Sequence, residues 1–256
     1  MPVVRQTPDH SKFNADAELP FELRLADFEV AMQDVYDFLY DVNRHLVSKG
    51  LARLDDMLRA ANLSGMLSDM LTESLAKHSR TLVVNAHHNG HPDLLVRGQY
   101  ENDSAKAGEA GVEVKTTKKR GGAVDTHGGR DQWMCVFVYD IDNDTEPAVN
   151  RRALVFREVY LAHVSVEDFR RNERGELGTR TSTLDKDGVK VLRENWIYLD
   201  KIALAARKVA AKKAPAAKKA APAKKSAAAR KRPVAAKRTV PAKKAPAAKK
   251  VTRRPS

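Results

Sequence analysis

The stretch that decides the fold begins at His91-Pro92-Asp93-Leu94-Leu95-Val96 and resumes, after a polar turn region, at Val112-Glu113-Val114-Lys115-Thr116-Thr117. Each of these two apolar runs is typical of a strand. Side chains two residues apart on a strand share a face, so Glu113 and Lys115 should project to the same side. We therefore expect two carboxylates and one ammonium group on the strands of a sheet.

These residue types suit the metal-assisted hydrolysis of a phosphodiester. Carboxylate oxygens, here those of Asp93 and Glu113, are the ligands that a hard divalent cation prefers. Such a cation activates water and neutralises charge on the scissile phosphate. Lys115 can orient the attacking water or stabilise the developing oxyanion. An acidic residue two positions before a lysine is a weak signal alone, but Glu113-Val114-Lys115 is its one occurrence in the chain.

Pro92-Asp93, Glu113-Val114-Lys115 and their flanking strands resemble the PD-(D/E)XK nuclease superfamily, which has the restriction-endonuclease-like fold. The resemblance covers about residues 65–140. It implies an α/β fold with a three-layer core around a central mixed sheet. It also implies that Asp93 and Glu113 ligate Mg²⁺ and that Lys115 assists the attacking water.

Members of this superfamily often add an acidic metal ligand from a preceding helix. By that resemblance Glu73 is the candidate for a third metal ligand, and Asp69 is the weaker one. The RecB-like branch places a Gln and a Tyr four residues apart after the lysine. Here Gln132 is followed at that spacing by Val136, which argues against membership of that branch.

Several basic residues near the strands are candidates for DNA binding. Lys118 and Lys119 directly follow the strand that carries Lys115, and His127 and Arg130 lie in a glycine-rich segment before the next strand. The guanidinium of Arg130 has the fork of donors that binds a phosphate. The alternative for this segment is an ordinary loop.

His87, His88 and His91 form a histidine cluster. Neutral imidazoles can bind zinc, and histidine can act as a general base. No cysteine pairs accompany the cluster, and a carboxylate site lies beside it. We therefore expect these histidines near the phosphate path or in solvent.

Charge is divided unevenly along the chain. The first 206 residues carry 27 Lys and Arg against 33 Asp and Glu, whereas residues 207–256 carry 19 Lys and Arg and no acidic residue. This tail repeats basic pairs, among them Lys212-Lys213 and Lys218-Lys219, in a background of alanines and prolines. With few apolar side chains it cannot bury enough surface to fold alone, so we expect it to be disordered.

The tail resembles the Lys-Ala-Pro tails of linker histones and of some actinobacterial nucleoid proteins. Lysines that neutralise phosphates release condensed counterions, which favours binding to double-stranded DNA. The tail has no aromatic residue. We expect it to add affinity for DNA without sequence preference.

The one cysteine, Cys135, excludes an internal disulfide and a multi-cysteine zinc site. Its apolar neighbours favour a buried core thiol. No apolar run approaches the ~20 residues that span a bilayer, and residues 1–14 lack the apolar core of a signal peptide. We expect a soluble, cytoplasmic and nucleoid-associated protein without a membrane partner.

Four segments follow from these patterns: a flexible lead at 1–19, a helical region at 20–80, a core sheet region at 81–206 and the basic tail at 207–256. Between Pro20 and Gly50, apolar residues recur at alternating spacings of four and three, a repeat that predicts one long helix. The members of this repeat are Phe21, Leu25, Phe28, Met32, Val35, Leu39, Val42 and Leu46. The helix either packs on its own domain or pairs with its copy in a homodimer through residues 21–46.

Further elements are expected along the rest of the body. Shorter helices are predicted at 51–61 and 63–79, and strands at 81–84, 93–96, 112–117, 133–140 and 153–163. A short helix at 166–171 and a hairpin about Asp185-Lys186-Asp187-Gly188 complete the body. Helices followed mainly by strands indicate a three-layer α/β arrangement.

The sequence thus favours an Mg²⁺-dependent DNA endonuclease of restriction type that its tail tethers to DNA. Two alternatives stay open. One is a nucleoid-associated or regulatory DNA-binding protein on a nuclease-like scaffold. The other is a structure-specific repair nuclease, which would use the same chemistry but recognise the shape of its substrate.

Overall fold

A computed structural model describes residues 3–126, 128–172 and 181–201. The chain divides into two units, Met1–Ala214 and Pro215–Ser256, and all of the described residues belong to the first. His127 and the tail lysines Lys212, Lys213, Lys218 and Lys219 lie outside the described residues.

The centre of the fold is a mixed sheet of six strands in the order β1-β2-β3-β5-β6-β9. The strands are β1 (Leu82–Val84), β2 (Leu94–Val96), β3 (Gly111–Thr117), β5 (Gln132–Asp140), β6 (Val155–Val164) and β9 (Trp196–Leu199). β3 and β5 are parallel, and every other neighbouring pair is antiparallel. The α/β class and the mixed sheet are therefore confirmed.

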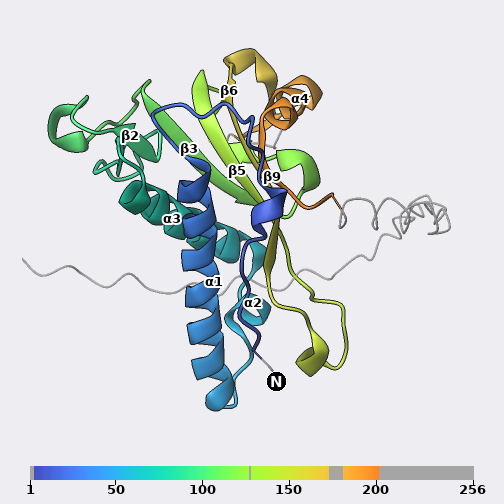
Figure 1. Ribbon diagram of the computed structural model, residues 1–256. Coiled ribbons are helices and arrows are strands. Elements are labelled where there is room, and N and C mark those ends of the chain that lie inside the picture. Colours follow the sequence, from blue (N-terminus) through green and yellow to red (C-terminus); the bar gives the residue numbers. More distant parts are fainter. Residues whose placement is uncertain (1–2, 127, 173–180, 202–256) are drawn as a thin grey trace, which may run out of the picture. The chain divides into compact units, whose positions relative to one another are not determined.

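Helices cover one face of this sheet. α1 (Leu25–Ser48), α2 (Leu54–Met57) and α3 (Ala60–His78) precede it in sequence, and α1 and α3 contact each other (Figure 1). Apolar side chains of the helices and strands share one core, which includes Phe28, Met32, Val35, Leu63, Leu67, Leu71, Val114, Cys135 and Phe137. Burial raises the pKa of the Cys135 thiol, as expected for a core cysteine.

The opposite face is covered by α4 (Lys186–Glu194), whose Leu192 packs in a second core with Val136 and Tyr160. The predicted hairpin at residues 185–188 is therefore wrong. The Asp185 side chain accepts hydrogen bonds from the backbone N–H groups of Asp187 and Gly188, which is an N-cap and not a β-turn.

A small second sheet has the order β4-β8-β7 and was not expected from the sequence. Its strands are β4 (Asp125–Thr126), β7 (Phe169–Arg171) and β8 (Ser182–Leu184). The short helix predicted at 166–171 stops after one 3₁₀ turn, Val166–Asp168, because the next three residues pair with β8.

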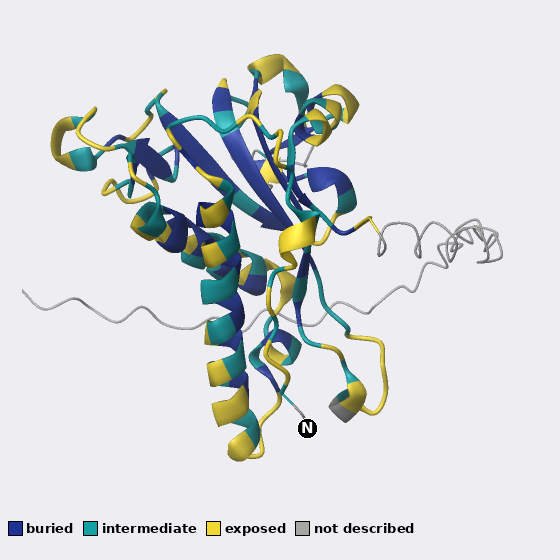
Figure 2. Ribbon diagram, in the orientation of Figure 1, coloured by how far each residue is buried: buried dark blue, intermediate teal, exposed yellow. Residues whose placement is uncertain are grey.

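The apolar repeat of α1 faces the core of its own chain. Phe28, Met32, Val35 and Leu39 are all buried, and Figure 2 shows α1 with buried residues along one side and exposed residues along the other. These four residues, at the centre of the repeat, are therefore occupied by contacts within the same chain. This outcome favours the alternative in which the helix packs on its own domain.

Two residues of the expected lead contact the last strand of the sheet. The Asn14 N–H donates to the Ile197 carbonyl at 3.0 Å, and the Phe13 ring contacts the Tyr198 ring with centroids 5.0 Å apart. Phe21 and Glu22 each have a φ of 54°, so the chain turns there and α1 begins at Leu25, later than the Pro20 that the sequence predicts. No helix in the described part of the chain is long and apolar enough to cross a membrane.

Candidate active site

The alternation of side chains along β3 separates its core residues from its polar ones. Val112 and Val114 point into the core under α1 and α3. Glu113 pairs with Met134, and Lys115 pairs with Val136, and both β5 partners belong to the second core on the α4 side. Glu113 and Lys115 therefore lie on the face opposite to α3.

Asp93 reaches the same strand from the residue just before β2. Its Oδ2 accepts a hydrogen bond from the Val114 N–H at 2.9 Å. The close approach of β2 and β3 depends on Gly111, which has a φ of 154° and where a Cβ would lie 1.9 Å from the Leu94 carbonyl oxygen. Only glycine fits this position, and it lets the first strand residues pass close enough for Asp93 to contact β3.

Lys115 joins the two carboxylates. Its Nζ lies 2.6 Å from Glu113 Oε1 and 3.2 Å from Asp93 Oδ2. The Glu113 side chain is only 2% exposed, whereas those of Asp93 and Lys115 are 28% and 25% exposed. One cation therefore touches both acidic groups at a place that solvent can reach.

The groups of this cluster change one another's pKa values. Burial alone would raise the pKa of Glu113, but hydrogen bonds from His91 and Lys115 and the charge of Lys115 outweigh burial and lower this pKa to about 2. Burial alone would lower the pKa of Lys115, but the two carboxylates raise it. Burial, aided by the charge of Glu113, raises the pKa of Asp93 despite the nearby ammonium. At neutral pH the site therefore contains an ionised Glu113 and a protonated Lys115.

His91 is a member of the site that the sequence did not assign to a contact. Its Nδ1 lies 3.3 Å from Glu113 Oε2, and its side chain is 19% exposed. The other two histidines of the cluster, His87 and His88, are exposed. The signal in the sequence was the position of His91 two residues before Asp93.

The carboxylates of the cluster resemble the ligands that Mg²⁺ usually takes in proteins. Within the described ranges no group of three or more His, Cys, Asp or Glu residues is arranged to enclose a metal ion. Mg²⁺ is usually held by one or two carboxylates, and waters and substrate phosphates supply the other ligands. Asp93 and Glu113 both contact the ammonium group of Lys115, so their oxygens are close enough to one positive charge to fit this mode of binding.

The structure does not bring Glu73 to this cluster. Glu73 and Asp69 are exposed residues of α3. That helix packs with Leu63 and Leu67 against the core face of the sheet, whereas Glu113 lies on the other face. The helical spacing that buries the leucines turns both acidic residues outward. The prediction that Glu73 is a third metal ligand is therefore corrected: Glu73 does not lie with Asp93 and Glu113.

The basic candidates flank the site along the direction of β3. Lys118 and Lys119 are exposed just beyond the end of the strand, and Lys119 lies 3.7 Å from Asp125. Arg130 is half-buried and precedes β5, whose first residues pair with the start of β3. Since β3 and β5 are parallel, Arg130 lies toward one end of the site and Lys118 toward the other.

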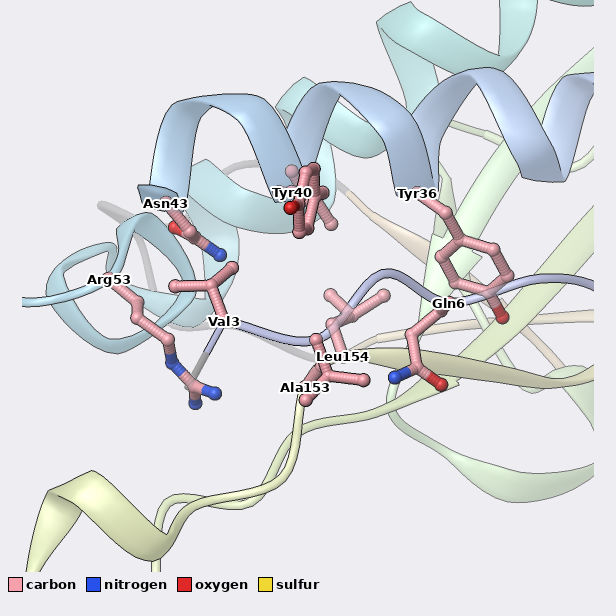
Figure 3. A pocket seen from close by; sticks show the side chains of 10 residues that line it. Val3, Gln6, Tyr36, Tyr40, Asn43, Arg53, Ala153 and Leu154 are labelled. Carbon is pink, nitrogen blue, oxygen red and sulfur yellow. The ribbon is translucent and has the colours of Figure 1, made fainter. Parts of the chain in front are cut away.

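A pocket elsewhere in the molecule offers less chemistry. The N-terminal segment, α1 and the residues just before β6 surround about 330 Å³ of empty space, part of it open to solvent (Figure 3). Its buried cation, Arg53, contacts Asp55, Asp56 and the Arg151 carbonyl. The donors of Arg53 are therefore directed at the protein, and this pocket is not the better candidate.

Lys115 on β3 thus contacts both Glu113 on the same strand and Asp93 just before β2, and His91 lies next to Oε2 of Glu113. Comparisons of the chain with models of protein families, with curated proteins and with solved structures gave no match. Paired carboxylates beside an ammonium group can bind a hard divalent cation and stabilise negative charge on a phosphate.

Proposed function

We propose that this protein is an Mg²⁺-dependent DNA endonuclease, of restriction type, that hydrolyses phosphodiester bonds. The observation that carries the proposal is the contact of Lys115 with both Asp93 and Glu113 on the solvent-accessible side of β3. Asp93 and Glu113, which lie twenty positions apart in the sequence, thus share one ammonium group, and this contact supports the proposal.

Each residue has a distinct role in this proposal. When bound, Mg²⁺ would activate water and neutralise charge on the scissile phosphate. Asp93 and Glu113 would hold it through carboxylate oxygens. Lys115 keeps its proton because its pKa is raised, so it acts as a hydrogen-bond donor and positive charge and not as a general base. It would orient the attacking water or stabilise the oxyanion.

DNA as the substrate is supported by the distribution of charge. Lys118 and Arg130 lie toward opposite ends of the site, where they would meet phosphates on either side of the scissile bond. The 19 basic residues of the tail would add salt-sensitive affinity that does not depend on sequence.

The test is cleavage of plasmid and genomic DNA with Mg²⁺ by the full chain and by Lys115→Ala. We expect discrete fragments from the wild type, none with a chelator, and a loss of at least about 100-fold in rate for Lys115→Ala. Lys49→Ala is the matched control, since Lys49 is exposed at the end of α1 and should leave the rate unchanged.

The outcomes separate the alternatives. Salt-sensitive binding without cleavage of methylated or unmethylated DNA would reject the proposal in favour of a nucleoid-associated or regulatory protein. Cleavage of flaps or four-way junctions, with plain duplex left intact, would indicate a structure-specific repair nuclease. Cleavage that persists in Lys115→Ala and Glu113→Gln would place the chemistry elsewhere in the chain.

A further inference from the structure

His91 is held in place by its backbone. Its N–H donates to the Lys106 carbonyl at 3.2 Å, and its carbonyl accepts from the Gly108 N–H at 2.6 Å. His91 thus forms a bridge with the loop between β2 and β3. Both backbone hydrogen bonds go to residues 106–108, so the backbone of His91 is anchored to that loop.

Asn85 braces the same pair of loops. Its side-chain amide donates to the Pro92 carbonyl at 3.0 Å and to the Ala105 carbonyl at 2.8 Å, and its oxygen accepts from the Ala105 N–H at 3.0 Å. Gly90 permits this packing, since a Cβ there would lie 2.3 Å from the Ala105 carbonyl oxygen. The loops therefore form one braced support for His91 and Asp93.

The two oxygens of Glu113 are held by different groups. Oε1 contacts Lys115 at 2.6 Å, and Oε2 lies 3.3 Å from Nδ1 of His91. An ionised carboxylate can only accept a hydrogen bond, so Nδ1 of His91 carries the hydrogen. These two donors, one on each oxygen, fix the orientation of a carboxylate that is almost completely buried.

We propose that His91 is a positioning residue of the candidate active site, which holds Glu113 in the orientation that receives a divalent cation. This inference rests on the proposed metal-dependent function. Groups that hydrogen-bond a metal-ligating carboxylate orient it, and their removal typically weakens metal binding by about 10–100-fold. His91 acts through Glu113 and need not touch the metal or the DNA.

The test measures binding of Mn²⁺ to the full chain without DNA, through the electron paramagnetic resonance signal of the free ion. His91→Ala should raise the Kd for Mn²⁺ about tenfold or more. His91→Asn should restore most of the affinity, because the asparagine amide nitrogen can occupy the place of Nδ1 and donate to Oε2. His88→Ala, which removes an exposed histidine from the same loop, should leave the Kd unchanged.

Thermal unfolding of each variant verifies that it is folded. If His91→Ala does not fold, His91→Leu replaces it, because leucine fills much of the same volume without a donor. Equal loss of affinity in His91→Asn and in the donor-free variant would overturn the inference, since a nitrogen lone pair of His91 would then be the required group.

Failure of the inference can be told apart from failure of the proposed function. If the wild type binds Mn²⁺, Glu113→Gln loses the ion and the donor-free His91 variant binds normally, the positioning role is wrong and the metal site stands. If the wild type and Glu113→Gln behave alike, with or without binding, the metal site at Glu113 is wrong and the inference falls with it.

Discussion

Glu113 shows how much of the site depends on single residues. An ionised carboxylate that is 2% exposed is costly to bury unless its oxygens are hydrogen-bonded and a cation lies nearby. Lys115 supplies the cation for Glu113 and at the same time for Asp93. Removing the ammonium group would leave two carboxylates together without a counter-charge.

Lys115→Met should therefore destabilise the protein in the absence of a divalent cation. Breaking a buried ion pair typically costs about 3–5 kcal/mol, and the partial exposure of this one reduces the expected loss to about 2–3 kcal/mol. The pKa of Lys115 is raised, so its contribution is complete below the ordinary lysine pKa of about 10.4 and is lost only as the pH rises through the higher folded value. Chemical unfolding at pH 6–9 should show the loss.

Mg²⁺ provides the internal check on that prediction. In Lys115→Met the added cation can replace the missing charge between Asp93 and Glu113, so it should raise the unfolding temperature more than in the wild type. Lys49→Met, at an exposed position, should show neither effect. An equal response of all three proteins to Mg²⁺ would contradict the replacement of the Lys115 charge by the cation.

At this scale the sequence predicted the residues but not all of their contacts. Asp93, Glu113 and Lys115 could be found because strand alternation and chemical type both restrict them. Glu73 was assigned wrongly because the sequence does not tell which face of the sheet a helix covers. The contact of His91 with Glu113 depends on the pairing of His91 with Ala107, which is a property of two loops and not of a local pattern.

Among the elements, the sequence predicted the long ones and also the short strands β1 and β2, but it missed α4 and the three strands of the small sheet. A long helix or strand repeats its pattern of apolar residues several times, which makes it easy to predict. This holds for α1, α3, β3, β5 and β6. α4 was missed because Asp-x-x-Gly signals both a turn and a helix N-terminus, and the packing of Leu192 on the sheet decides between them. The pairing of the first residues with β9 joins segments that are far apart in the chain.

The orientation of α1 gives a prediction about stability and association. Phe28 is completely buried, so Phe28→Ala should lower the free energy of unfolding by about 3–5 kcal/mol. Phe38, which is 39% exposed, is the matched control, and Phe38→Ala should cost under about 1 kcal/mol. Denaturant unfolding measures both. If Phe28→Ala left stability intact but changed the sedimentation coefficient in a concentration-dependent way, α1 would be a dimer helix after all.

A polar cluster also joins α1 to α3. Asp34 Oδ2 accepts from Ser74 Oγ at 2.7 Å and lies 2.9 Å from Nε2 of His78. Burial alone would raise the pKa of Asp34, but the hydrogen bonds from Ser74 and His78 outweigh it and lower this pKa. A carboxyl group with a lowered pKa contributes stability above its unfolded pKa of about 3.9, and the contribution is lost as the pH falls through the folded value.

Asp34→Asn should therefore lower the unfolding free energy at pH 6 by a modest amount, under about 1 kcal/mol because the side chain is 38% exposed. The difference from the wild type should shrink as the pH falls from about 3.9 through the lower folded pKa, below which the folded wild type also lacks the charge. Urea unfolding from pH 3 to pH 6 measures it. A difference that grew toward low pH would show that the sign of the Asp34 contribution is wrong.

For the whole molecule, the net charge differs in sign between two parts of the chain. The negative charge of the first part opposes DNA binding, and the positive charge of the tail favours it. The first 206 residues carry 33 acidic against 27 basic side chains, so at long range this part repels DNA. Residues 207–256 reverse the sign with 19 basic residues. If the chain acts on DNA, the tail is needed to bring a mildly acidic body to a polyanion.

Replacing the 19 Lys and Arg of residues 207–256 by Gln in the full-length chain should therefore weaken DNA binding most at low salt. Each phosphate contact that is lost should reduce the slope of log K against log salt by about 0.9 on duplex DNA. Cleavage in a single turnover at saturating protein should stay unchanged, because Lys115 and the carboxylates are intact. A tail with the same residues in shuffled order is the control and should bind like the wild type, since charge density and not order sets the affinity. An unchanged salt slope in the Gln variant, or a shuffled tail as weak as the Gln one, would reject the electrostatic tether.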